Sequence, residues 1–231
     1  MVARKRGSIP ATLVLLNFNE IAGLRTLIRK IPHRRFAQCF AVDPGSRDGS
    51  REFLIAHGIP ILHQKKLGRG VAFQLAIVHA KHENVVFFSP DGNEDPVDIL
   101  HIVKLLSQGQ DMVIASRFLP ESHNEEDEQF LKLRKWANQT FTMLVNLRWR
   151  GHITDSINGY RGIKKSAFEN MRPDASGFSI EYQLTIRALK HGLKITEIPT
   201  QEGDRIGGES KAQSIPTGLV MLRTLWRELL E

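Results

Sequence analysis

The first half of the chain alternates short apolar runs with stretches of helical length, and this alternation restricts the fold more than any other feature. The apolar runs are Ala11–Phe18, Gln38–Val42, Pro60–His63, Asn84–Phe88 and Asp111–Ala115. Short runs without polar alternation are typical of strands buried on both faces of a parallel sheet. The stretches between them are Glu20–Ile31, Ser50–His57, Val71–His82 and Pro96–Ser107. This pattern predicts a doubly wound α/β sheet.

The second half of the chain has a different pattern, which we interpret as an extension of the same domain. After an acidic segment we predict a long helix, a strand, a helix, a strand and a final amphipathic helix: Phe130–Arg150, Tyr160–Ile163, Ser179–Lys190, Leu193–Ile198 and Pro216–Leu230. We therefore expect a flexible basic N-terminus at residues 1–10, one α/β domain at residues 11–212 and an amphipathic C-terminal helix at residues 213–231.

The composition fits one folded domain and excludes several classes of protein. A chain of 231 residues with 41 % hydrophobic and 25 % charged residues is neither collagen-like nor wholly disordered. Cys39 is the only cysteine, which excludes an internal disulfide, a four-cysteine zinc site and a CxxC redox motif. No apolar run approaches the ~18–20 residues that cross a bilayer. We expect a cytoplasmic protein that is at most peripheral on the cytoplasmic face of the membrane.

The net charge of +7 indicates an anionic partner. Nucleic acid, an acidic membrane surface and a phosphorylated substrate are all compatible with it, and the charge alone does not distinguish them. Basic and aromatic residues are interleaved only in the stretch 130–150, so we expect no nucleic-acid partner.

Four polar loops each follow one of the predicted strands directly. They read NFNE at residues 17–20, DPGSRDGS at 43–50, SPDGN at 89–93 and SRF at 116–118. Ligands of open α/β sheets bind beyond the carboxyl ends of the strands, so four such loops indicate a single site for a nucleotide or another polyanion. The sequence contains no P-loop, HExxH or GxSxG motif. Gly68-Arg69-Gly70 does not continue as a dinucleotide motif, because Phe73 stands at the third glycine position.

The order of these motifs resembles that of family-two glycosyltransferases with the GT-A fold. Residues 42–50, VDPGSRDGS, are similar to the family's VDDGSxDGT loop. The same order continues over residues 11–212 with Asn19-Glu20, Gly68-Arg69-Gly70, Asp91, Ser116-Arg117-Phe118, Thr154-Asp155, Gly159-Tyr160-Arg161, Glu181, Arg205 and Ser210-Lys211. The most similar subgroup is the dolichol-phosphate mannose synthase type, which transfers a sugar from a nucleotide to a polyprenyl phosphate.

The resemblance implies a fold and a division of labour along the chain. The fold is an α/β fold of the GT-A (Rossmann-like) type: a mixed, mostly parallel sheet flanked by helices in a single domain. Residues 11–118 would form the half that binds the nucleotide sugar, and residues 119–212 the half that binds the acceptor.

The resemblance also implies which residues bind the donor, a GDP- or UDP-hexose. These residues are Asn19, Glu20, Asp43, Ser89, Asp91, Glu181, Arg205 and Lys211. Pro44 stands where the family has a second acid, so the contacts of that side chain are lost. Lys66 and Arg69 receive no role and are compatible with surface charge.

A weakened Mg²⁺ or Mn²⁺ site is implied at residues 89–93. The family binds the cation with an Asp-x-Asp motif and a further Gln, whereas this chain has Ser89, Asp91 and Asn93 at those positions. Hard cations prefer anionic oxygen ligands, and here only Asp91 is charged. We expect Asp91 and Asn93 as metal ligands, with the donor diphosphate supplying much of the coordination. The same residues also fit a type I turn with Pro90 at its second position.

For the acceptor phosphate the resemblance implies Arg117, Arg134 and Asn138. The planar fork of arginine suits phosphate because it binds two oxygens at once. A phosphate acceptor is already an anion at neutral pH, so its activation needs no strong general base. We expect Asp91, Arg117 and Asp155 to be the catalytic residues, and the resemblance implies inversion at the anomeric carbon.

The sequence thus predicts an inverting glycosyltransferase that moves a hexose, mannose or glucose, from a nucleoside-diphosphate sugar to a polyprenyl or dolichyl phosphate. Two alternatives remain open: the same fold acting on a soluble or glycan acceptor, and a non-catalytic homologue that binds nucleotide sugars. The stretches 130–150 and 216–230 combine apolar residues with tryptophan and basic residues. This suits helices at a lipid surface, and equally helices that pack in the core or in a dimer.

Overall fold

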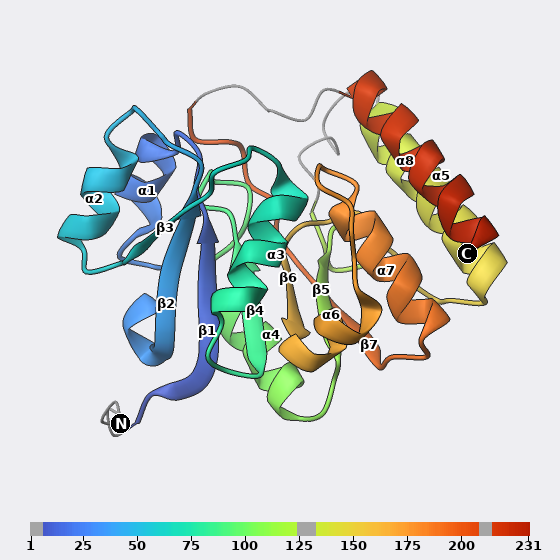
Figure 1. Cartoon of the computed structure of the whole chain (residues 1–231), viewed down its shortest axis with the longest axis horizontal. Coiled ribbons are helices and arrows are strands. Elements are labelled where there is room, and N and C mark those ends of the chain that lie inside the picture. Colours follow the sequence, from blue (N-terminus) through green and yellow to red (C-terminus); the bar gives the residue numbers. More distant parts are fainter. Residues whose placement is uncertain (1–6, 124–132, 208–213) are drawn as a thin grey trace.

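A computed structural model of the chain describes residues 7–123, 133–207 and 214–231 (Figure 1). At its centre lies a seven-stranded sheet with the strand order β3-β2-β1-β4-β6-β5-β7. The strands are β1 (Ile9–Leu16), β2 (Phe36–Asp43), β3 (Ile61–His63), β4 (Asn84–Phe88), β5 (Met112–Ser116), β6 (Arg161–Lys164) and β7 (Ile195–Pro199). β6 runs antiparallel to its neighbours β4 and β5, and the other neighbouring pairs are parallel. The predicted mixed, mostly parallel sheet is confirmed.

Helices cover both faces of the sheet, which explains why its central strands are mostly apolar on both sides. One face is covered by α1 (Ile21–Leu27), α2 (Ser50–Ala56) and α4 (Asp98–Ser107), and the other by α3 (Arg69–His79), α6 (Lys165–Met171) and α7 (Ile180–Lys190). Successive strand residues point to opposite faces. Leu13 and Phe88 accordingly pack with the first group of helices, and their neighbours Val14 and Phe87 with the second.

Two short elements, α6 and the 3₁₀ helix η1 (His33–Arg35), are absent from the sequence prediction. α6 has seven residues and buries only Ala167, Phe168 and Met171, which is too little for a recognisable helical period. α1 is shorter than predicted and ends at Leu27 instead of Ile31. Residues 28–30 continue as a turn, and Pro32 disfavours the helical conformation at Ile31, the residue that precedes it.

α5 (Leu133–Trp149) and α8 (Ser214–Leu230) form an outer layer on α7, away from the sheet (Figure 1). Val145 of α5 and Met221 of α8 are buried against Tyr182 and Ile186 of α7. Other large apolar side chains of the two helices are exposed: Trp136, Met143, Leu147, Leu219, Val220, Leu222, Trp226 and Leu230. Each helix therefore has both a packed side and an open apolar side. Within the described part of the chain, no helix combines the length and the apolar character that crossing a bilayer requires.

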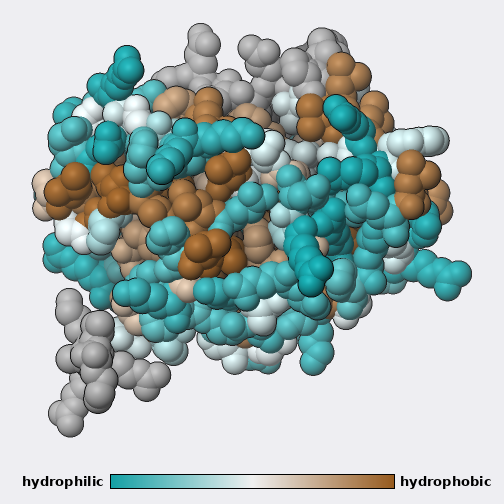
Figure 2. Space-filling model, viewed as in Figure 1, coloured by the Kyte–Doolittle hydropathy of each residue, from teal (hydrophilic) through white to brown (hydrophobic). Residues whose placement is uncertain are grey.

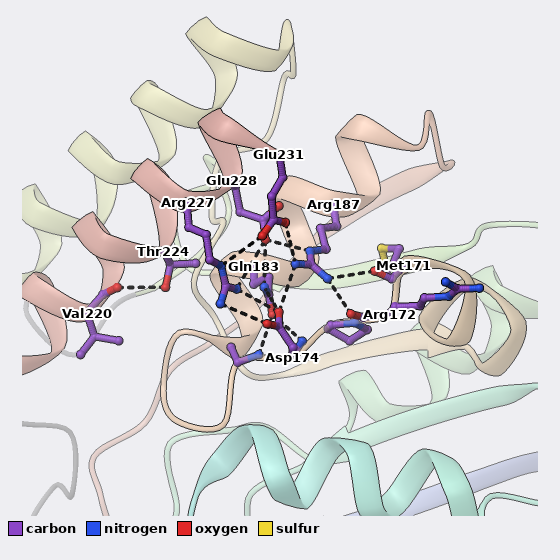
Figure 3. A network of polar contacts seen from close by, with 12 residues as sticks. Met171, Arg172, Asp174, Gln183, Arg187, Val220, Thr224, Arg227, Glu228 and Glu231 are labelled. Carbon is purple, nitrogen blue, oxygen red and sulfur yellow. Dashed lines mark hydrogen bonds and ion pairs between the residues drawn. The ribbon is translucent and has the colours of Figure 1, made fainter.

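A buried carboxylate, Glu228, ties α8 to α7 (Figure 3). It accepts hydrogen bonds from Arg187 Nε at 2.8 Å, Gln183 Nε2 at 2.8 Å and Lys190 Nζ at 3.2 Å. The Arg187 guanidinium also reaches Asp174 at 3.0 Å, in the loop between α6 and α7. Burial alone would raise the pKa of Glu228, but these donors together bring that pKa below its usual range. Charges as well as apolar contacts thus hold α8 in place.

Glu228→Gln is expected to lower the free energy of unfolding by about 1–3 kcal/mol, because Arg187 and Lys190 are left with a neutral partner at a buried position. Thermal unfolding followed by circular dichroism measures this as a fall of roughly 2–4 °C per kcal/mol for a chain of this size. Glu231→Gln is the matched control, since Glu231 also pairs with Arg187 but is 49 % exposed. The control should cost less than about 0.5 kcal/mol, and equal losses in both variants would contradict the role of Glu228.

Candidate active site

A pocket of about 800 Å³ opens at the carboxyl ends of β1, β2 and β4. Its wall is formed by the loops after these strands, the start of α3, the loop before β6 and the segment after β7. Three of the four polar loops predicted to meet at this edge therefore line one cavity. The polar side chains of the wall include Asn17, Glu20, Gln64, Arg69, Ser89, Asp91, Asn93, Glu94, Asn158, Glu202 and Arg205.

One part of the pocket wall is apolar. It is formed at the ends of β1 and β2 and in the segment before α3, by Leu16, Phe18, Val42, Pro44 and Leu67. Pockets that combine apolar walls with a few polar groups are the usual sites for small molecules with a flat ring at one end and charges at the other. Pro44, whose family counterpart is an acid, thus contributes apolar surface here.

Asp43 organises the loop after β2 and lies behind the pocket wall. Its side chain is fully buried. Oδ1 accepts the N–H groups of Gly45 and Ser46 at 2.7 and 2.8 Å, while Oδ2 accepts Asn17 Nδ2 at 2.6 Å and the Ser46 hydroxyl at 2.5 Å. Asn19 joins the same loop, because its backbone N–H donates to the Ser46 hydroxyl at 2.8 Å. Neither Asp43 nor Asn19 belongs to the pocket lining. Both therefore contribute to the pocket by fixing the conformation of the loops that form its wall.

Arg205 joins two carboxylates across the pocket. Its Nη1 donates to Oδ2 of Asp91 at 2.8 Å, and its Nη2 donates to Oε1 of Glu20. The segment after β7, which carries Arg205, is fixed on the loop after β4, since the carbonyl of Asp91 accepts the N–H of Ile206 at 2.7 Å. Gly92 permits this approach: a Cβ there would lie 2.6 Å from Ile206 Cγ1. Glu20, Asp91 and Arg205, which are far apart in the sequence, meet at one place.

Arg69 enters the pocket from the start of α3, which corrects its interpretation as surface charge. The side chain is only 21 % exposed, and its Nε donates to Oε1 of Glu181. Its Nη1 lies 3.4 Å from the Ser89 hydroxyl. Gly159 leaves room for the guanidinium, because a Cβ at that position would lie 1.9 Å from Arg69 Nη2. Glu181 and Ser89, both predicted donor ligands, are therefore linked through a residue that the prediction left out.

Glu94 is a carboxylate of the pocket that the sequence analysis missed. Its Oε2 accepts the backbone N–H of Ser89 at 2.6 Å, and the Ser89 hydroxyl hydrogen bonds to the same carboxylate. Burial raises the pKa of Glu94 well above its usual range, and the neighbouring Asp91 raises it further, while Arg69 opposes the rise. The residue lies just beyond the SPDGN segment, so its place next to Asn93 was the only signal in the sequence.

Arg117 lies behind Glu202 at the edge of the pocket, paired with Asp155. Its Nε and Nη2 donate to Oδ2 and Oδ1 of Asp155 at 2.7 and 3.1 Å, and its Nη1 lies 3.7 Å from Glu202. Burial alone would raise the pKa of Asp155, but Arg117 brings that pKa below its usual range. Arg117 and Lys135 of α5 both lie on the ring of Phe118, at 5.3 and 5.9 Å from its centre, so α5 borders this pair.

Of the remaining predicted residues, Lys211 and the side chain of Arg134 lie outside the residues that the structure describes. Asn138 is half-buried on α5 and does not line the pocket. Lys135, which no motif singled out, is the basic residue of α5 that the structure brings to Arg117. Across the described ranges, no group of three or more His, Cys, Asp or Glu side chains is placed to hold a metal ion.

The family model described as glycosyl transferase family 2 matches residues 12–172. The chain belongs to this family. The match includes the loops after β1, β2, β4 and β5, which carry Glu20, Asp43, Asp91 and Arg117. The protein is therefore a glycosyltransferase whose sugar comes from a nucleotide sugar.

Sequence similarity to individual proteins covers more of the chain than residues 12–172. The sequence is 26 % identical to the glycosyltransferase AglJ of Haloferax volcanii over 212 residues, which cover 91 % of this chain and 69 % of AglJ. It is also 26 % identical to the polyprenol monophosphomannose synthase of Mycolicibacterium smegmatis over 216 residues, covering 87 % of this chain and 80 % of that protein.

Solved structures with the same fold bear out the predicted GT-A architecture. The structure resembles glucosyl-3-phosphoglycerate synthase from Mycobacterium tuberculosis in complex with Mn²⁺, UDP and phosphoglyceric acid, with a TM-score of 0.77 and 17 % identity. The similarity covers 94 % of this chain and 78 % of the synthase. A complex of the same synthase with Mg²⁺ and UDP has a TM-score of 0.75. In these complexes that synthase is bound to a divalent cation and UDP.

Proposed function

We propose that this protein transfers a hexose, mannose or glucose, from a GDP- or UDP-sugar to a polyprenyl phosphate, with inversion at the anomeric carbon. The observation that carries the proposal is the Arg117–Asp155 pair at the edge of the donor pocket. It offers a fixed cation to an anionic acceptor, whereas a hydroxyl acceptor needs a carboxylate that can take its proton. With both oxygens bound by Arg117 and its pKa depressed, Asp155 is a poor general base.

The donor fits the pocket with its base on the apolar wall and its diphosphate toward the guanidinium groups. Arg205 and Arg69 are each only about a fifth exposed and are held by carboxylates, so their positions are set before the donor binds. Fixed charges of this kind stabilise a leaving nucleoside diphosphate without reorganisation at the moment of reaction. Glu181 lies outside the pocket lining and is 3 % exposed, so it would act on the donor by holding the Arg69 guanidinium in place.

A divalent cation fits the chemistry of the pocket. The pocket wall contains four acidic residues and two arginines, so an incoming diphosphate enters a site with an excess of acids: Glu20, Asp91, Glu94 and Glu202 against Arg69 and Arg205. The candidate ligands in residues 89–93 are oxygen atoms, which is the set that Mg²⁺ and Mn²⁺ prefer. Asp91 and Asn93 would hold the ion. When bound, it would neutralise the negative charge that develops on the leaving diphosphate.

The open apolar side of α5 and α8 would bring a lipid-linked acceptor to the pocket. Trp136 and Trp226 are 54 % and 67 % exposed, and the exposed arginines Arg148 and Arg223 lie on the same helices. Apolar and aromatic side chains bordered by basic residues favour contact with an anionic membrane surface. Figure 2 shows part of this apolar surface at the corner of the molecule that α8 occupies. Since Lys135 of α5 borders Arg117, the same helix reaches the proposed phosphate site.

The proposal is tested by transfer assays with UDP- and GDP-hexoses, Mn²⁺ and two kinds of acceptor, a short-chain polyprenyl phosphate and simple saccharides. We expect transfer to the prenyl phosphate alone. The double variant Arg117→Gln/Asp155→Asn keeps a neutral, hydrogen-bonded pair in place of the ions. It should raise the KM for the prenyl phosphate by about 10–100-fold and change the donor KM by less than about threefold.

Each contrary result has its own meaning. Transfer to saccharides would favour the soluble or glycan acceptor. A larger effect of the double variant on the donor KM would remove Arg117 from the acceptor site. Binding of a nucleotide sugar, measured by calorimetry with and without Mn²⁺, without transfer to either acceptor would favour the non-catalytic homologue.

A further inference from the structure

We propose that Glu94 supplies the carboxylate that is missing at position 89, and that it binds the divalent cation of the donor diphosphate together with Asp91. The inference rests on the proposed function and assigns a metal-binding role to a residue outside the family motif. Its starting point is Ser89, which stands at the first acidic position of the Asp-x-Asp motif and cannot contribute charge.

The backbone brings Glu94 back to position 89. The loop after β4 reverses direction between the two residues, so that Glu94 Oε2 accepts the N–H of Ser89 at 2.6 Å and the Ser89 hydroxyl bonds to the same carboxylate. The carboxylate is thus fixed beside the residue whose acidic side chain the family uses. A serine suits this position, because its small side chain leaves space for the carboxylate and donates a hydrogen bond to it.

The fixed carboxylate still has capacity for a cation. A carboxylate has about four lone-pair sites, and the two bonds from Ser89 use only part of them. Glu94 lines the same pocket as Asp91, so the two acids approach one space from one loop. Together they provide two carboxyl groups, and cations bound with a substrate diphosphate use one or two protein carboxylates. A metal ion displaces the proton from a carboxyl ligand that it binds.

The positively charged side chain of Arg205 already occupies the position next to Asp91. The Arg205 guanidinium binds Asp91 at 2.8 Å and binds Glu20 as well. Because Glu20 remains as its partner, Arg205 can turn from Asp91 to the donor diphosphate when a metal ion takes its place. The guanidinium on Asp91 shows that this part of the pocket accommodates a positive charge beside that acid.

The test measures Mn²⁺ binding directly, without turnover. Free Mn²⁺ is followed by electron paramagnetic resonance while it is titrated into the purified protein with saturating UDP or GDP. Glu94→Gln keeps the shape and the bond from the Ser89 N–H but removes the charge, and it should weaken Mn²⁺ binding by about 10–100-fold. Asp95→Asn is the matched control. Asp95 is the next acid along the chain, and its carboxylate caps Val97 N–H at 3.0 Å, a bond that asparagine can keep.

A compensating variant separates a metal ligand from a residue that only holds the loop. Ser89→Asp/Glu94→Gln returns the acid to position 89 and should restore Mn²⁺ affinity to within about threefold of the unaltered protein. Thermal unfolding of each variant checks the fold. Unchanged affinity in Glu94→Gln, or failure of the compensating variant when its fold is intact, would overturn the assignment of Glu94. Absence of nucleotide-dependent Mn²⁺ binding in the unaltered protein would instead overturn the metal-dependent function from which the inference starts.

Discussion

Asp91→Asn is expected to lower kcat/KM for sugar transfer by about 100–1,000-fold, the range found when one charge-stabilising contact to a transition state is removed. Asp91 is the charged residue on which the proposed metal site depends most, and its carboxylate also binds Arg205 at 2.8 Å. Asparagine keeps the size of the side chain and leaves the backbone bond to Ile206 intact, so the loop should keep its conformation. Steady-state kinetics at saturating acceptor over a range of Mn²⁺ concentrations measure the loss.

Asp204→Asn is the control for this variant. Asp204 is exposed and directly precedes Arg205, so it carries the same charge on the same segment without facing the pocket. We expect its kcat/KM to stay within about twofold of the unaltered protein, since an exposed charge near a site contributes little. If Asp91→Asn loses no more activity than Asp204→Asn, Asp91 neither binds the cation nor positions Arg205.

The fold could be predicted from the sequence because both faces of the sheet are buried. Central strands such as β4 and β5 are then almost continuous apolar runs, and such runs are recognisable without knowledge of their partners. The antiparallel direction of β6 carries no local signal, since it depends on pairing with β4 and β5, which lie more than 40 residues earlier in the chain. The short helix α6 was not predicted for a related reason. Most of the stabilisation of such a helix comes from packing against the rest of the fold and not from its own sequence pattern.

The candidate site was predicted in part, and the errors share a cause. A motif indicates that a residue lies near the site, but the direction of its side chain depends on contacts that are distant in the sequence. Asp43 was predicted to bind the donor, whereas four hydrogen bonds from neighbouring residues use its oxygens to shape the loop. Asp155 was predicted to act at the reaction centre, and it is bound to Arg117. For these two carboxylates a positioning role is the simpler interpretation.

The residues that the sequence analysis missed are defined by long-range contacts. Arg69 meets Glu181 across 112 positions of the chain, and no local pattern reports such a pair. The glycines on either side of Arg69 were a partial signal. A Cβ at Gly70 would lie 1.9 Å from the carbonyl oxygen of Ala175, so the start of α3 must approach another loop closely. Two glycines on either side of an arginine thus indicate that this segment packs closely against another part of the chain.

Gly159→Ala is expected to lower donor affinity by about 10–100-fold while the fold is retained. The new Cβ would lie 1.9 Å from Arg69 Nη2 and 2.9 Å from Glu181 Oε1. Both atoms are at the ends of side chains, so the backbone need not move, but the guanidinium must leave its position beside Ser89. A displaced charge at a preorganised site commonly costs a factor of this size. Calorimetric titration with UDP- and GDP-sugars in the presence of Mn²⁺ measures the affinity.

Gly177→Ala is the control, because no atom lies within 4 Å of a Cβ at that position, and its donor affinity should not change. Arg69→Gln supplies the decisive comparison. If Gly159→Ala acts by displacing the Arg69 guanidinium, it should weaken donor binding far less in the Arg69→Gln background than in the unaltered protein, since residues that act through one contact are not additive. Additive losses would show that the alanine disturbs the pocket by another route, and the space at Gly159 would then have no connection with Arg69.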